Sequence, residues 1–194
     1  FSTAMGSMKF NNSESRVKCF GVDSSNNPIA SKNVEVLFYN SEDDFAIKLK
    51  TKEREEVVLY KTTGENKSFE ENYEEVKKKQ SSYSGKTTFE EDDMLRIPFI
   101  KVNAEINYDE LCGREIKNSK YYIKQALQTI DFELNNVGGS VKSEAVIDST
   151  QKVWTEKPRK MIFDSDFILY LKEENKEQPY FALKVDNTDV LLPE

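Results

Sequence analysis

Alternating hydrophobic positions predict β-strands with one buried face in three separate segments of the chain. A period of two puts one set of side chains against a core and the other set in solvent. The apolar positions that follow this period are Phe45, Ile47 and Leu49, then Ile130, Phe132 and Leu134, and finally Phe181, Leu183 and Val185. Two more segments, 34–39 and 55–60, are rich in β-branched and aromatic residues. Such continuous runs are typical of strands with more than one buried face.

One helix is predicted after residue 67. Ser68 and Glu71 have the spacing of a capping box, in which each residue satisfies a backbone N–H near the start of the helix. Lysines at 77–79 suit the negative C-terminal end of the helix dipole. A shorter helix is expected around 108–112, and the serines and glycine of 81–85 predict a connecting loop. The apolar face of the longer helix consists of Phe69, Tyr73 and Val76.

A segment that otherwise has the composition of a loop, 139–150, also alternates. Its intervening residues are mostly polar, and a strongly apolar hairpin follows it at 161–171 and 180–185. An ordinary surface loop has no reason to alternate, so this segment is predicted to be able to join a sheet. The small or apolar set is Gly139, Val141, Ser143, Ala145, Ile147 and Ser149.

Composition fits one globular domain or a large part of one, with 37% hydrophobic and 32% charged residues over 194 positions. The net charge of −7 argues against nucleic acid or an anionic membrane as a partner, because both favour clustered lysine and arginine. No apolar run approaches the length of a membrane span. Cys19 and Cys112 lack any metal-ligand spacing and are expected to be free, partly buried thiols.

Histidine is absent from the sequence. This removes the usual general base for a serine or cysteine nucleophile and the commonest zinc ligand. The seven glycines never gather into a phosphate-binding loop. We therefore expect no enzymatic activity, no metal site and no cofactor. Asn11 and Asn66 begin Asn-x-Ser sequons, the pattern that precedes N-glycosylation.

Sequences on both sides of the alternating segment resemble one protein family. Before it, IKQAL at 123–127 leads to FELNNVG at 132–138. After it come FDSDFILYLK at 163–172 and YFALKVDN at 180–187. Together these stretches resemble the reactive-loop region and the closing sheet-B hairpin of a serpin, with Gly138 at the proximal-hinge glycine of the family.

Earlier parts of the chain are similar to the same family. Residues 1–10 resemble the end of the third strand of sheet A and the adjoining breach. Phe10, Phe20 and Val34 fall at the spacing of the following sheet-C strands. Ile-Pro at 97–98, followed by Ile-Lys-Val, resembles a family strand with the pattern Leu-Pro-x-Phe-x-Ile.

The resemblance implies an α+β serpin fold and a single domain of which 1–194 is the C-terminal part. This part would contain strands of sheets B and C, a portion of sheet A, a reactive-centre loop at 137–160 and the closing sheet-B hairpin at 161–194. The N-terminal half of the same protein is then an expected partner. An extracellular, secreted location is also expected from the family.

The function implied by the resemblance is inhibition of a serine protease by a suicide-substrate mechanism. In serpins the protease cleaves the loop, and the N-terminal part of the loop inserts into sheet A as an additional strand. Glycine at the hinge accepts backbone angles closed to other residues, which suits this refolding. The hinge would consist of Gly138, Gly139, Val141, Ser143 and Ala145.

Two ways of counting give different reactive bonds. Counting forward from the hinge places the specificity residue at Lys152, so Lys152–Val153 would be cut by a trypsin-like protease. Counting backward from Phe167 gives Thr155 instead. Trp154 lies between them and would suit a chymotrypsin-like protease, because a large aromatic ring is a natural anchor for a pocket. We prefer Lys152–Val153, with Trp154–Thr155 as the alternative.

Departures from the family pattern leave three interpretations open. Asn136 and Val137 stand where inhibitory serpins carry two glutamates, and Leu183 stands at a usual glycine. The first interpretation is an inhibitory serpin, and the second is a non-inhibitory serpin whose loop binds a partner without inserting. The third is an unrelated β-rich interaction module. Heat resistance before and after loop cleavage separates the first two, because only an inserting serpin gains stability when cut.

Overall fold

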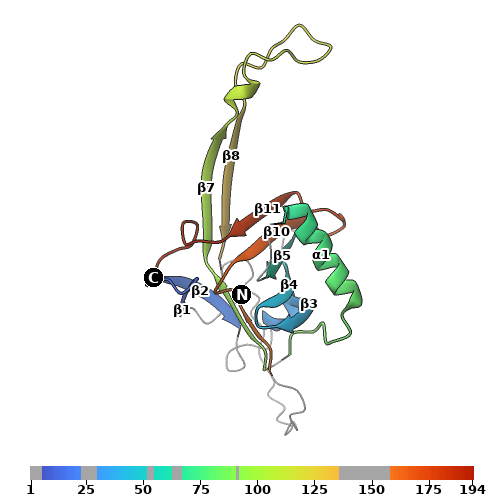
Figure 1. Cartoon of the computed structure of the whole chain (residues 1–194), viewed down its shortest axis with the longest axis vertical. Coiled ribbons are helices and arrows are strands. Elements are labelled where there is room, and N and C mark those ends of the chain that lie inside the picture. The colour runs from blue at the N-terminus through green and yellow to red at the C-terminus, as the bar shows by residue number, and fades with distance from the viewer. Residues whose placement is uncertain (1–5, 23–29, 52–54, 63–66, 91, 136–157) are drawn as a thin grey trace.

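The chain folds into three β-sheets with one α-helix in the described part of the structure, a computed structural model (Figure 1). The described residues are 6–22, 30–51, 55–62, 67–90, 92–135 and 158–194. The described part is thus β-rich with one helix, in agreement with the expectation of an α+β fold.

The largest sheet has five antiparallel strands in the order β11-β10-β5-β4-β3. One face packs on the main core, and the other lies under the helix. Burial of both faces along β3 and β5 confirms the prediction from their continuous apolar runs. The strand bounds are β3 (Val34–Ser41), β4 (Asp44–Lys50), β5 (Glu55–Lys61), β10 (Phe167–Glu173) and β11 (Phe181–Val185).

Helix α1 (Phe69–Ser82) begins with the predicted capping box. The backbone N–H of Glu71 donates to Ser68 Oγ at 3.2 Å, and the N–H of Ser68 donates to Glu71 Oε2 at 2.8 Å. The loop predicted at 81–85 is wrong at its start, since Ser81 and Ser82 belong to the last helical turn. Their hydroxyls donate to the carbonyl of Lys78 at 2.8 and 3.1 Å, so these serines fit the helix end.

A second sheet has four strands in the order β1-β2-β6-β9. Its last pair, β6 and β9, is parallel, and the other pairs are antiparallel. Phe20 lies in this sheet, but Val34 does not, because it begins β3 of the five-stranded sheet. The expected sheet-C placement of Val34 is therefore wrong. The strand bounds are β1 (Gly6–Lys9), β2 (Arg16–Val22), β6 (Met94–Pro98) and β9 (Lys160–Ile162).

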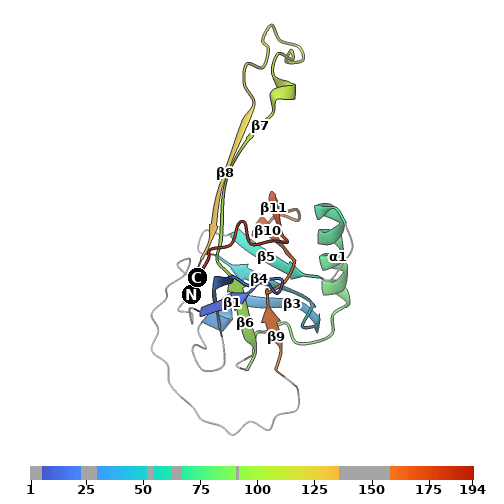
Figure 2. The ribbon, with the colours of Figure 1, turned by 60° about the vertical axis from the view of Figure 1, so that its left-hand side comes forward.

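The third sheet is a hairpin of β7 (Ile100–Asn107) and β8 (Leu127–Leu134), which we call the arm. It projects from the body of the molecule in both views (Figures 1 and 2). A 3-10 helix at Asp109–Leu111 lies at its far end, within the short helix expected at 108–112. No helix in the described ranges is long and apolar enough to cross a membrane.

The main core lies between the five-stranded and four-stranded sheets and is rich in phenylalanine. The rings of Phe45 and Phe163 lie 4.9 Å apart, and those of Phe163 and Phe167 lie 5.2 Å apart, both edge to face. Such ring pairs add about 1 kcal/mol beyond the area that they bury. Residues from the N-terminal, central and C-terminal parts of the chain therefore share one core. Cys19 is buried and Cys112 is exposed, and both are free thiols.

Candidate functional site

The predicted hinge and reactive bond lie outside the described residues. This applies to Gly138, Gly139, Val141, Ser143 and Ala145 and to Lys152, Val153, Trp154 and Thr155. The structure does describe both ends of the segment that contains them. Strand β8 ends one residue before Asn135, and Pro158 and Arg159 precede β9. The candidate site is therefore defined by these two ends, which belong to different sheets.

The N-terminal end of the segment follows β8, one of the two strands of the arm. All eight residues of β8 pair with β7, from Leu134 opposite Ile100 to Leu127 opposite Asn107. Within the described residues, β8 has no second strand partner. Its other edge therefore presents a row of backbone groups suited to pairing with an additional strand.

The arm also has one apolar face. Opposite pairs on this face are Val102 with Phe132 and Ala104 with Ile130. Only its base reaches the core, where the ring of Phe132 lies 5.6 Å from that of Phe181. A two-stranded sheet is marginal by itself in water, and an apolar face of this kind marks a surface for another element. The opposite face is mostly polar and includes Lys101, Asn103, Glu105, Asp131 and Glu133.

The C-terminal end of the segment is fixed by an ion pair between Arg159 and Asp93. Nε of Arg159 lies 3.1 Å from both carboxylate oxygens of Asp93, and Nη2 lies 2.5 Å from Oδ2. The same guanidinium donates to the carbonyls of Lys86 and Thr88, both at 2.6 Å. Burial by itself would lower the pKa of Arg159, but its bonds to Asp93 outweigh that effect and raise the pKa. We call these four residues the Arg159 clamp.

The chain that follows β9 is fastened by a second polar cluster. Lys61 Nζ donates to Asp164 Oδ1 at 2.6 Å and to the carbonyl of Ile162 at 2.9 Å. The backbone N–H of Asn11 donates to the carbonyl of Asp164 at 2.8 Å. The Asn11 side-chain amide donates to Asp166 Oδ1 at 2.8 Å, so the asparagine of this sequon has a structural role. The segment from β9 to β10 is therefore held by the side chain of Lys61 and by both the backbone and the side chain of Asn11.

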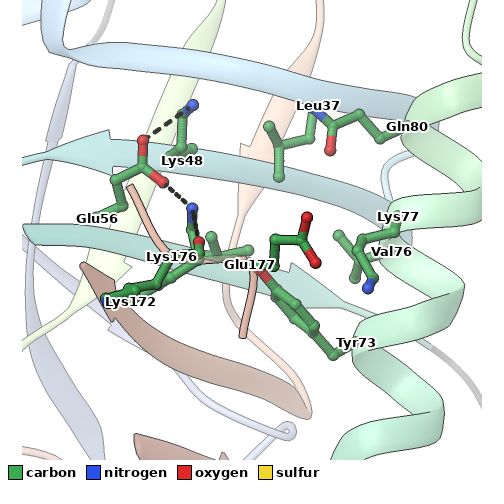
Figure 3. A pocket seen from close by; sticks show the side chains of 11 residues that line it. Leu37, Lys48, Glu56, Tyr73, Val76, Lys77, Gln80, Lys172, Lys176 and Glu177 are labelled. Atoms are coloured by element: carbon green, nitrogen blue, oxygen red, sulfur yellow. Dashed lines mark hydrogen bonds and ion pairs between the residues drawn. The ribbon is translucent and has the colours of Figure 1, made fainter. Parts of the chain in front are cut away.

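A hollow of about 450 Å³ lies between α1 and the five-stranded sheet (Figure 3). Glu56 at its wall bridges two lysines, with Oε1 3.3 Å from Lys48 Nζ and Oε2 2.7 Å from Lys172 Nζ. Burial would raise the pKa of Glu56, but the two lysines lower it. Glu56 thus links lysines on the two strands that flank its own, and Lys48 has a second carboxylate partner in Glu35, with Nζ 2.9 Å from Oε2. No group of three or more candidate metal ligands occurs among the described residues.

Sequence reasoning missed Arg159, Asp93 and Lys61 as anchoring residues. Arg159 and Asp93 are 66 positions apart, and Lys61 and Asp164 are 103 apart. No periodicity joins residues at such separations. The one available signal was chemical, because Lys61 directly follows the apolar run 57–60. In the structure its side chain is only 5% exposed. A buried lysine needs a carboxylate partner somewhere in the fold.

The chain is similar to the solved structure of Serpin48, a highly specific serpin in the insect Tenebrio molitor. The sequence identity is 17% and the TM-score is 0.47, over 94% of this chain and 50% of the other. The chain thus spans about half the length of the solved protein that it matches. No family model and no curated protein matches the chain.

Proposed function

We propose that this chain is the C-terminal half of a serpin that inhibits a serine protease through a cleavable loop at 137–160. In this proposal the chain supplies the sequence that the protease cleaves and several strands of the sheets, and it performs no catalysis of its own. The observation that carries the proposal is the edge of β8 that has no strand partner within the described residues and lies just before the alternating segment 139–150. A receptive strand edge and a sequence patterned as a strand are thus joined by four residues, 135–138.

The proposed reaction starts when the serine hydroxyl of the protease attacks the carbonyl carbon of Lys152. The peptide bond to Val153 breaks, the amine of Val153 takes up the proton that the serine gives up, and Lys152 is left joined to the protease as an acyl ester. Cleavage frees the alternating segment, which turns back at Gly138 and Gly139 and pairs antiparallel with β8. Pairing along β8 adds on the order of eight ladder hydrogen bonds at about 1 kcal/mol each. Burial of the apolar set adds a few kcal/mol more. This total is comparable with the stability of a typical domain, about 5–15 kcal/mol, and is sufficient to drive the change.

The proposed partners are an extracellular trypsin-like protease and the N-terminal half of the same protein. The N-terminal half would cover the apolar face of the arm and pair with the other edge of the inserted strand. Without that half, this chain should therefore be cleaved by the protease as an ordinary substrate and should trap no protease. A covalent complex formed by the 194-residue chain alone would contradict this part of the proposal.

The test is to incubate the whole protein with trypsin and look for a complex that survives SDS. We expect such a complex with the wild-type protein and its loss in Lys152→Ala. Retention of the complex in Lys152→Ala but loss in Trp154→Ala, with chymotrypsin as the protease, would move the reactive bond to Trp154–Thr155. Cleavage at either bond without a complex, and without a gain in heat resistance, would favour the non-inhibitory binding protein.

A further inference from the structure

Strand β9 is too short to hold its place by sheet pairing alone. It has three residues, which pair with Met94, Leu95 and Arg96 of β6, and it lies at the edge of the sheet. Parallel pairing is slightly weaker per residue than antiparallel pairing, and short edge elements open more readily than central strands. The adjacent ion pair of Lys160 with Glu42 has a 3.7 Å separation and two half-exposed side chains, so it adds little.

The Arg159 clamp is a much stronger attachment at the same place. The side chains of Arg159 and Asp93 are only 12% and 4% exposed, so solvent screens their attraction weakly. Arg159 is also fixed through its backbone, whose N–H donates to Asp93 Oδ1 at 3.1 Å and whose carbonyl accepts from Met94 at 2.9 Å. Charge-assisted, bidentate bonds of this kind are the strongest hydrogen bonds that side chains make.

Asp93 is itself held rigidly. Its Oδ2 accepts from the backbone N–H of Glu90 at 2.8 Å, and its own N–H donates to the carbonyl of Glu90 at 3.1 Å. The carbonyls of Lys86 and Thr88 that Arg159 contacts come from the connection between α1 and β6. One side chain therefore ties the end of the reactive segment to a fixed turn and to that connection.

We propose that Arg159 and Asp93 are positioning residues that keep β9 in its sheet and thereby fix the C-terminal end of the reactive segment during attack by the protease. A fixed end should favour trapping of the protease over release of a cleaved product. This consequence for inhibition rests on the proposed function. The attachment of β9 by the clamp does not rest on it.

The test uses hydrogen exchange in the whole protein, with Asp93→Asn as the main variant. Because this change leaves a buried guanidinium without its carboxylate, amides of β9 should exchange at least about tenfold faster. Arg159→Lys keeps the charge but loses the bidentate geometry, so it should give a smaller increase. The matched control is Lys160→Met, which removes the neighbouring exposed pair and should leave exchange of β9 within about twofold. Unchanged exchange of Leu169 in β10 checks that each variant is folded.

A second measurement addresses the consequence for inhibition. The number of inhibitor molecules cleaved for each trypsin trapped should be severalfold higher in Asp93→Asn than in wild type. It should be only slightly higher in Arg159→Lys and unchanged in Lys160→Met. Exchange of β9 that is equal in Asp93→Asn and Lys160→Met would overturn the clamp. Faster exchange in Asp93→Asn, in a protein whose wild type traps neither trypsin nor chymotrypsin, would support the clamp and reject the proposed function.

Discussion

At the scale of single residues, Gly21 shows how closely two strands approach in the four-stranded sheet. A Cβ at this position of β2 would overlap the carbonyl oxygen of Leu95 in β6. Because backbone atoms cannot move aside cheaply, Gly21→Ala should separate the strands and lower the unfolding free energy by about 2–3 kcal/mol. Urea denaturation of the whole protein measures this change.

Gly6 provides the matched control for that prediction. A Cβ there would meet Cys19 Sγ at 3.8 Å, which is ordinary van der Waals contact. Gly6→Ala should therefore change the unfolding free energy by less than about 0.5 kcal/mol. Equal effects at the two glycines, which both lie in strands, would show that strand propensity, and not the close approach to Leu95, governs the cost.

Residues differ in how far their role was predictable from the sequence. Ser68 and Glu71 were predictable as a capping box because they are three positions apart and their partners are local backbone groups. Arg159 and Asp93 were not, because a salt bridge across 66 positions depends on how β9 and β6 meet. The anchors of the candidate site therefore needed the fold. The alternation of 139–150 is visible in the sequence, and its ability to join a sheet stays a prediction because these residues lie outside the described part.

At the scale of elements, alternation predicted the faces of strands correctly but not always their neighbours. The inward set of β4, with Phe45, Ile47 and Leu49, is fully buried as expected. Val34 was expected in a sheet-C strand, yet β3 pairs with β4. A hydrophobic period indicates which side chains of a strand face a core. The connections between strands determine which strand pairs with it.

The attachment of α1 to the five-stranded sheet depends on an ionised carboxylate. Glu75 accepts from Lys67 and Lys79, both at 2.8 Å, and from the hydroxyl of Tyr60 at 3.1 Å. Burial would raise the pKa of Glu75, but hydrogen bonds from the two lysines outweigh it and lower the pKa from 4.5 to about 2. A carboxylate with a lowered pKa stabilises the fold fully above the pKa of the unfolded chain. That stabilisation is lost as the pH falls from about 4.5 toward 2.

Glu75→Gln should therefore lower the unfolding free energy by roughly 1–2 kcal/mol at pH 7, since partial solvent exposure screens part of the full effect. The difference from wild type should shrink between pH 4.5 and pH 2 and then vanish. Urea midpoints measured across this range test the prediction. Glu174→Gln at an exposed position is the control, with an expected change below about 0.5 kcal/mol at pH 7. A difference at Glu75 that did not vary with pH would contradict the ionic attachment.

At the scale of the whole molecule, the arm is the part least explained by the described residues alone. Ala104 and Ile130 lie on its apolar face beyond the contact of Phe132 with the body. A hairpin of two strands has too little burial to account for such a face. If the whole protein contains the proposed N-terminal half, that half should cover the apolar face of the arm.

In the whole protein, a charged residue should be more costly on the apolar face of β8 than on its polar face. Ile130→Asp would place a charge on the apolar face, and covering that face should make the change cost about 3 kcal/mol or more. Thr129→Asp, one residue away on the polar face, should cost less than about 1 kcal/mol. Unfolding free energies from urea denaturation give both values. If the arm stayed open to solvent in the whole protein, Ile130→Asp would be as mild as Thr129→Asp, because a solvated aspartate on an uncovered strand loses no hydration.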